Sequence, residues 1–381
     1  MHCALLTERR RRPHLPAPAW AALAAWAAVW TLPHLDHSAL SWRFFALGGH
    51  LLTRPGIGGG LHVYGRHPVL QIGPLALAAA AGFDSLGGAG RLCAVLVLAT
   101  IGLVLVAVVE RTRVADVAVT PRRLLLCAVL FLPVWMELAF HYTHLDDGLA
   151  LLFAALAVQT AAKDRPVWTG VLLALAADSK PWAVAFVPLL LAVGRHGRTR
   201  AFAAWAVGLA AAWAPFLLAD TRTLTAAKFA IPNTATSALR ALGVTSSGTP
   251  TWDRPAQFLL GALVAAVAVK TGRWPAALFA ALSIRILLDP GTYAYYTAGL
   301  VLAAVYVDLF LARRAIPLFT AFAVAGVYAL RATPVDLGTL GAIRAGYCLL
   351  GLAALFRLTP SVRSANGRTS VRVPIPTRSM P

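Results

Sequence analysis

The residues best suited to chemistry lie in one short segment, from His141 to Asp147. It holds two histidines, His141 and His144, and two adjacent acids, Asp146 and Asp147. Carboxylates and imidazoles exchange protons near neutral pH, and together they bind divalent cations. We predict that Asp146 and Asp147 are catalytic and that both histidines belong to the substrate pocket. One acid has a structural alternative, because Asp147 before Gly148 would cap the next helix. The sequence makes no cofactor certain, and Mg²⁺ or Mn²⁺ is the candidate.

A further acid, Asp36, closes the first apolar stretch within His34-Leu35-Asp36-His37. A carboxylate at the end of an apolar helix is partly desolvated, which makes it more basic. Asp36 is therefore predicted to be catalytic, as the general base that deprotonates an acceptor hydroxyl. Its alternative role is that of an ordinary solvated acid at a helix end.

Two cations are placed where a phosphate would meet them. Lys180 precedes Pro181, which ends the preceding helix, and a lysine held at such a break meets a phosphate as a point charge. Arg285 lies inside an apolar helix, where an arginine is costly and needs a partner or a ligand. Both are predicted to bind the donor phosphate. The alternatives are snorkelling of Lys180 to headgroups and pairing of Arg285 with Asp289.

Aromatic and imidazole side chains complete the predicted substrate pocket. The pocket residues besides His141 and His144 are His67, Tyr293, Tyr295 and Tyr296. An aromatic belt at a membrane interface is the alternative for the three tyrosines.

The elements that must position these residues are apolar helices. Hydrophobic residues make up 59% of the 381 residues and charged residues 13%, and mean hydropathy is +0.70. A soluble domain would carry about twice that charge. We therefore predict an all-α, polytopic membrane protein with about 10–13 transmembrane helices. The predicted spans are 17–35, 91–109, 123–140, 147–162, 166–178, 181–194, 201–219, 256–270, 275–289, 293–311, 316–330 and 338–357.

Charge placement predicts the orientation of these spans. Most of the 34 Lys and Arg fall at alternate gaps, and the chemical residues fall at the other gaps. By the positive-inside rule, the basic gaps face the cytoplasm. The stretch 68–82 is then an interfacial or re-entrant helix. The net charge of +19 is spread over many loops, which argues against nucleic-acid binding.

The same pattern predicts the domain organisation. Residues 1–16 form a basic cytoplasmic N-terminus, 17–357 the membrane domain, and 358–381 a disordered basic cytoplasmic tail. Residues 36–90 and 220–255 form two long outer loops, so the active site faces outward.

These motifs, in this order, resemble the GT-C superfamily of polyprenyl-phosphate-sugar glycosyltransferases. The motifs are an acid after the first span, His-x-Asp-Asp before a later span, a Lys-Pro break and a late Asp-Pro-x-x-Tyr-x-Tyr-Tyr. Within that superfamily the sequence is most similar to the mannosyltransferase-like glycosyltransferase family 87, over residues 17 to about 311. The first loop departs from the family pattern, because His37 to Trp42 stand where a second acid or a tyrosine-rich stretch is expected.

The resemblance implies a reaction and its partners. A sugar, mannose as the first choice, would pass from a polyprenyl-phosphate donor to a lipid or glycan acceptor of the cell envelope. Asp36 would match the family's catalytic base, with Asp146 as the alternative. Lys180 would match the family's lysine at the helix break. The chain carries no nucleotide-binding fingerprint, in keeping with a lipid-phosphate donor. A multi-spanning transporter or lipid flippase is the rival function, and its polar residues would line a path near the membrane midplane.

The predicted orientation is testable by cysteine labelling. We expect an impermeant thiol reagent to label cysteines introduced at residues 56–60 of intact cells, because these residues belong to an outer loop. Cysteines at residues 195–200 should react only after permeabilisation. Labelling of the second set in intact cells would contradict the orientation.

Overall fold

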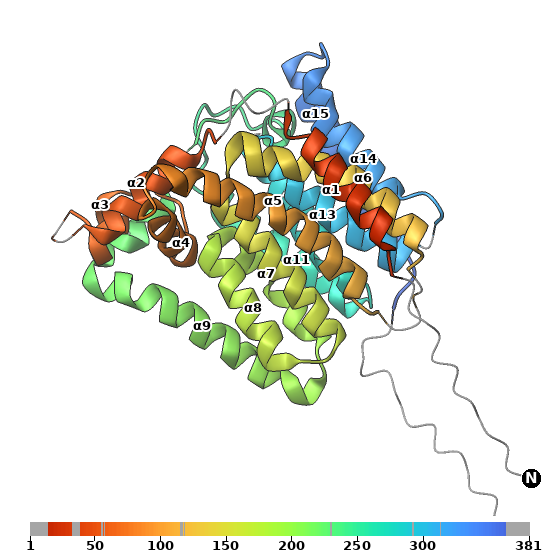
Figure 1. Ribbon diagram of the computed structural model, residues 1–381, viewed down its shortest axis with the longest axis horizontal. Helices are drawn as coiled ribbons and strands as arrows, with labels where there is room; N and C mark the ends of the chain where they lie inside the picture. The colour runs from red at the N-terminus through yellow and green to blue at the C-terminus, as the bar shows by residue number, and fades with distance from the viewer. Residues whose placement is uncertain are drawn as a thin grey trace, which may run out of the picture.

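The computed structural model describes residues 14–32, 39–54, 56, 58–114, 117, 119–228, 231–291, 293–312 and 314–362. This part of the chain is helical (Figure 1), and its only β structure is an isolated bridge between Pro232 and Gly248. The all-α prediction is therefore confirmed. The predicted N-terminus up to residue 13, Asp36 and the tail beyond residue 362 lie outside the described residues.

The helices follow one another along the chain with short connections. The α-helices are α1 (Ala17–Val29), α2 (Trp42–Thr53), α3 (Val63–Arg66), α4 (Pro74–Asp84), α5 (Gly88–Arg111), α6 (Pro121–Met136), α7 (Leu145–Ala162), α8 (Pro166–Ser179), α9 (Arg198–Ala219), α10 (Ala238–Ala241), α11 (Asp253–Lys270), α12 (Ala277–Leu288), α13 (Tyr296–Val307), α14 (Leu318–Ala323) and α15 (Leu337–Leu358). The 3₁₀ and π segments are η2 (Gly60–His62), η3 (Glu137–Tyr142), η4 (Pro181–Ala192), η5 (Arg195–Gly197), η6 (Thr221–Lys228), η7 (Trp274–Ala276), η8 (Asp308–Ala312), η9 (Val324–Tyr328) and η10 (Ala329–Ala332).

Five helices are long and apolar enough to cross a membrane. They are Gly88–Arg111, Pro121–Tyr142, Leu145–Ala162, Arg195–Ala219 and Leu337–Leu358. Further apolar helices of the described chain are shorter, with 10–17 residues, and a span needs about 20. The larger number of spans stays a prediction.

The centre of the molecule is made by α12 and α13. Every residue from Ala277 to Leu287 and from Thr297 to Val307 is buried. A helix that is apolar on all sides has no solvent face and packs inside a larger assembly of helices. These two helices therefore fix the positions of residues 289–291 and 293–295 between them.

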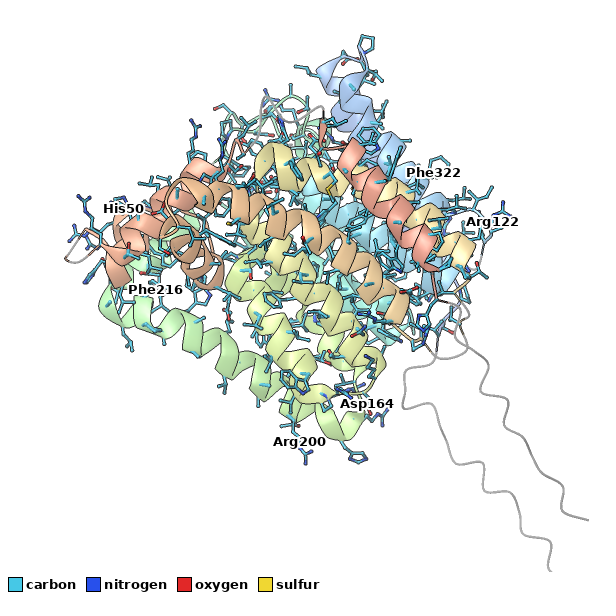
Figure 2. All side chains as sticks on the ribbon, in the orientation of Figure 1. His50, Arg122, Asp164, Arg200, Phe216 and Phe322 are labelled. Atoms are coloured by element: carbon cyan, nitrogen blue, oxygen red, sulfur yellow. The ribbon has the colours of Figure 1, made fainter. Side chains whose placement is uncertain are left out.

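In contrast, α9 lies at the edge of the molecule. It runs along one side in Figure 1, and in Figure 2 Arg200 and Phe216 mark its two ends. Only Ala201 and Phe216 of this helix are buried. Beyond its end, Arg222 hydrogen-bonds to Asp220 and lowers the pKa of that carboxyl to about 2.

The predicted break at Lys180 is confirmed. α8 ends at Ser179, Lys180 has an extended backbone (φ −144°, ψ 114°), and η4 starts at Pro181. The Gly73 N–H donates to the Ser179 carbonyl oxygen over 3.0 Å. This bond fastens the start of α4 to the break.

α4 covers most of the stretch 68–82. Its 11 residues extend for only about 16 Å at 1.5 Å per residue. A bilayer core is about 30 Å thick, so α4 alone is too short to cross it.

The close contact at Gly73 predicts a stability difference between two glycine substitutions. A Cβ atom at Gly73 would lie 2.1 Å from the carbonyl oxygen of Asp178, whereas one at Gly82 would meet nothing within 4 Å. We expect Gly73→Ala to cost about 1–3 kcal/mol of unfolding free energy through overpacking. Gly82→Ala, the matched control in α4, should instead stabilise by about 0.5–1 kcal/mol. Thermal unfolding of the purified variants checks this, and equal melting temperatures would contradict it.

Candidate active site

The site begins where α6 gives way to the π-helix η3. At its end Thr143 has φ +50°, and a β-branched residue in the left-handed region is strained. The Thr143 hydroxyl donates to the Ala139 carbonyl oxygen over 3.1 Å. This strained turn separates η3 from α7, whose N-cap His144 and first residues are buried.

The first loop docks onto the same turn. The N–H groups of residues 39–41 donate to the carbonyl oxygens of residues 140–142 over 2.8–2.9 Å. These carbonyls at the end of a helix would otherwise lack partners. Residues 39–41 are thereby fixed to the site, and Asp36, three residues before them in the sequence, lies outside the described residues.

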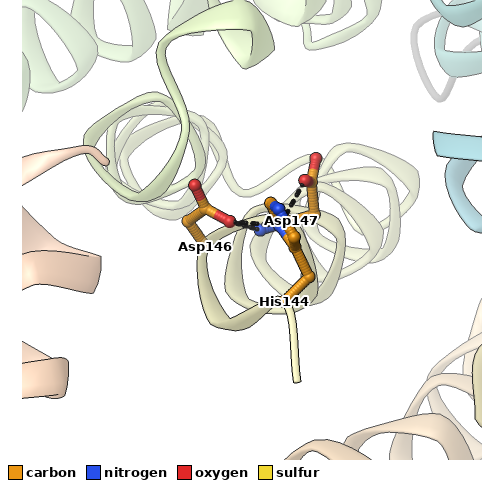
Figure 3. A group of neighbouring side chains, drawn as sticks. All are labelled: His144, Asp146 and Asp147. Carbon is orange, nitrogen blue, oxygen red and sulfur yellow. Dashed lines mark hydrogen bonds and ion pairs between the residues drawn. The ribbon is translucent and has the colours of Figure 1, made fainter. Parts of the chain in front are cut away.

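An imidazole joins the two predicted catalytic acids (Figure 3). His144 Nδ1 lies 2.7 Å from Asp146 Oδ1 and 2.8 Å from Asp147 Oδ2. Burial lowers the pKa of His144, but the two carboxylates outweigh burial, so the pKa is raised above its ordinary value. His144 therefore serves the cluster as a cation over a wider pH range than a free histidine.

The structure corrects the alternative role of Asp147 as a helix cap. α7 starts at Leu145 with His144 at the N-cap, so Asp146 and Asp147 both lie inside the first turn. Acids are favourable there because the start of a helix carries a partial positive charge. Asp146 also accepts the N–H of Asp147 over 2.8 Å.

Aromatic rings hold the His144 imidazole in place. Tyr295 stacks on it with ring centroids 3.7 Å apart, and Phe45 packs edge-on at 5.6 Å. Tyr295 thus supports the acid cluster through His144. Its ring comes from the segment between α12 and α13, so the most buried helices determine the geometry of this cluster.

Lys180 and Trp182 contact the acids from the helix break. The Lys180 ammonium forms an ion pair with Asp146 Oδ2 and lies 4.0 Å from Asp147 Oδ2. The Trp182 indole N–H donates to Asp147 Oδ1 over 2.9 Å. The break at Pro181 therefore aims both side chains at the start of α7.

Arg285 lies between two aromatic faces with its hydrogen-bonding capacity unused. Its guanidinium is 4.3 Å from the Trp182 ring centroid and 4.2 Å from that of Tyr296, and the residue is 6% exposed. Its nearest acids, Asp147 and Asp289, are 3.7 and 3.9 Å away. No described residue accepts a hydrogen bond from Arg285. A buried guanidinium whose N–H groups donate to no described residue is suited to bind an anion.

A third cation, Arg254, lies beside Arg285. Its Nη1 atom is 3.6 Å from Asp289 Oδ2 and donates to Gln257 Oε1 over 3.1 Å. Arg254 comes from the start of α11 and Arg285 from α12, so Asp289 links two helices through their cations.

All three cations border one large cavity. The cavity has a volume of about 690 Å³ and is lined by Lys180, Arg254 and Arg285. These cations lie together, because Lys180 and Arg285 share Asp147 and Arg254 and Arg285 share Asp289. Most of its remaining wall is apolar. One face of α9 supplies Trp205, Leu209, Trp213 and Leu217, which are spaced four residues apart. The cavity is thus an apolar chamber with a cationic end.

The structure gathers most of the predicted site residues. Asp146, Asp147, His144, Lys180, Arg285, Tyr295 and Tyr296 form one contiguous group. Tyr293 stacks on Tyr295 at 5.5 Å but is 44% exposed. His141 packs against Tyr142, which in turn contacts Tyr295. His67 lies apart from the cavity lining, with Nε2 3.0 Å from the Gly58 carbonyl oxygen.

Sequence reasoning missed Arg254, Trp182 and Tyr64. Arg254 was assigned to an outer loop, where an arginine gives no signal. Trp182 follows the Lys180-Pro181 break directly, and that proximity was the available clue. Tyr64, buried in the short α3, lines the cavity and packs on Trp213 at 5.3 Å.

The group His144, Asp146 and Asp147 has the composition of a metal site. Three of its four carboxylate oxygens already contact Lys180, the Trp182 indole N–H or the N–H of Asp147, and the fourth, Asp147 Oδ2, lies 2.8 Å from the His144 imidazole without a hydrogen bond. A divalent ion would have to displace the Lys180 ammonium or a charged imidazole. This donor arrangement therefore fits internal ion pairing better than Mg²⁺ or Mn²⁺.

Comparison with family models, curated proteins and solved structures gives no match to this chain.

Proposed function

We propose that this protein is a multi-pass membrane glycosyltransferase that transfers a sugar, mannose as the first choice, from a polyprenyl-phosphate donor. The observation that carries the proposal is the cavity, whose apolar wall ends at Lys180, Arg254 and Arg285. A polyprenyl phosphate has the complementary form, a long apolar chain with an anionic head. The free N–H groups of Arg285 would bind the phosphate oxygens.

The proposed placement in the membrane extends the same argument. Five helices have the length and apolar character to span it, and shorter apolar helices would complete the bundle. The acceptor would be a lipid or glycan of the cell envelope at the outer face, with both termini in the cytoplasm. This orientation rests on the distribution of Lys and Arg.

The proposed reaction is an inverting displacement at the anomeric carbon. The acceptor hydroxyl oxygen forms a bond to this carbon while the bond to the phosphate oxygen breaks. The departing phosphate takes the bonding electrons, and Lys180, Arg254 and Arg285 stabilise the added negative charge. The acceptor proton passes to a carboxylate base.

Asp36 is the first candidate for that base. Both oxygens of Asp146, the alternative, already contact proton donors, namely His144, Lys180 and the N–H of Asp147. Residues 39–41, which follow Asp36 closely in the sequence, hydrogen-bond to residues 140–142 beside the same cluster. These contacts favour Asp36 over Asp146 in the resting site.

The donor class is testable with purified protein in lipid nanodiscs. We expect sugar transfer from a polyprenyl-phosphate sugar and none from a nucleotide sugar, because a nucleotide has no apolar chain to fill the cavity. Radiolabelled product, separated by chromatography, is the measurement. Use of the nucleotide sugar would contradict the donor class, and movement of the lipid without glycosidic product would favour a flippase. A parallel assay with a chelator tests the need for a divalent ion.

The base is testable by two conservative substitutions. Asp36→Asn keeps the size of the side chain but removes its basicity, so turnover should fall by about 100-fold or more. Donor binding should change little, since the phosphate is bound by other residues. Asp84→Asn, outside the cavity lining, is the control and should keep full turnover. If Asp36→Asn stays active and Asp146→Asn is inactive with donor binding intact, Asp146 is the base.

A further inference from the structure

Each cation of the cavity has a buried carboxylate partner that does not line the cavity. Lys180 contacts Asp146, and Arg254 is closest to Asp289. Arg285 lies between Asp147 and Asp289. The cations line the cavity, whereas none of these three carboxylates does. Each cation of the cavity therefore has an acid beside it before any ligand arrives.

Lys180 is a cation whose carboxylate partner can be exchanged. Its side chain is 15% exposed and ends a flexible stem, whereas Asp146 is 1% exposed. Asp146 keeps two other contacts without Lys180, both at Oδ1: the His144 imidazole at 2.7 Å and the N–H of Asp147 at 2.8 Å. Loss of the ammonium would leave Oδ2 without that contact, but the carboxylate would still be paired with His144 through Oδ1, so its charge would not be isolated.

We propose that Asp146 is an internal counter-ion that competes with a bound phosphate group for the Lys180 ammonium. The identity of the ligand as a lipid phosphate rests on the proposed function. When the phosphate enters the cavity, Lys180 turns to it, and Asp146 relies on His144 and the backbone. Asp146 is then a specificity-determining residue. An anion binds Lys180 only if it interacts with the ammonium more strongly than the Asp146 carboxylate does.

This competition predicts that a substitution in the binding site increases the affinity for phosphate. Substitution of a residue in a binding site generally weakens binding. Here, neutralising Asp146 should tighten the binding of phosphate ligands, because Lys180 no longer has a strong competing partner. By the same coupling, the gain must vanish when Lys180 is absent, since the two substitutions act on one interaction.

The test is a double-mutant cycle read out by equilibrium binding in nanodiscs. The proteins are the wild type, Asp146→Asn, Lys180→Met and the double variant, with Asp84→Asn as the matched control. The ligands are a polyprenyl monophosphate, the uncharged polyprenol and inorganic phosphate. Thermal unfolding and gel filtration confirm that each variant is folded.

We expect Asp146→Asn to bind the polyprenyl monophosphate about tenfold more tightly than the wild type, which corresponds to about 1.4 kcal/mol. Lys180→Met should bind it more weakly, and adding Asp146→Asn to Lys180→Met should change nothing further. The polyprenol should bind equally to the wild type and to Asp146→Asn, because it has no charge. Asp84→Asn should match the wild type throughout.

Unchanged or weaker binding by Asp146→Asn overturns the proposal, as does tightening that persists without Lys180 or that extends to the polyprenol. Absence of any phosphate binding by the wild type overturns it too. Tightening for inorganic phosphate alone supports the counter-ion role and removes the lipid as the ligand. If no sugar is transferred but the double-mutant cycle gives the expected binding changes, the proposed function is wrong and the counter-ion role of Asp146 is still supported.

Should Asp146→Asn fail to fold, the wild type itself provides the measurement. Infrared difference spectra of the polyprenyl monophosphate complex against the polyprenol complex report changes in carboxylate stretching bands. A band shift that is lost in Lys180→Met supports the exchange of partners. Identical spectra overturn it.

Discussion

The structure depends on the neutralisation of charge in a buried, apolar setting. Isolated charges cannot be held among helices such as α12 and α13, where almost every side chain is apolar, so each cation needs an acid nearby. Lys180, Arg254 and Arg285 therefore require Asp146, Asp147 and Asp289 at fixed positions. This requirement ties together the start of α7, the break after α8 and the end of α12.

The local distortions of the chain serve this charge cluster. The π-helix η3, the left-handed Thr143 and the break at Lys180 each interrupt a helix that could otherwise have continued. Such irregularities cost free energy and persist only where the surroundings enforce them. Here the docking of residues 39–41 and the stacking of Tyr295 on His144 supply that enforcement.

The sequence predicted the parts of this arrangement that local chemistry determines. The length of the apolar stretches predicted the helices, and Pro181 predicted the break. The position of Arg285 inside an apolar helix indicated that this residue has a partner or a ligand. It did not predict the pairing of Lys180 with Asp146, because 34 residues separate them and close helix packing brings them together. Arg254 was missed for the same reason. The capping role predicted for Asp147 is wrong because the helix starts three residues earlier, with His144 at its N-cap.

The rotation of α9 about its own axis is set without a polar and an apolar face. Its inner face lines the cavity with Trp205 and Leu209, and its outer face exposes Val207 and Leu218, so both faces are apolar. Burial of apolar surface therefore gives little preference for one rotation of the helix. Shape gives that preference instead, through the two close-contact glycines, Gly170 beneath the Ala201 carbonyl and Gly208 on Ala174. The absence of a Cβ atom at Gly170 and Gly208 therefore positions the wall of the cavity. A Cβ atom at either glycine would rotate α9 and change the shape of the cavity.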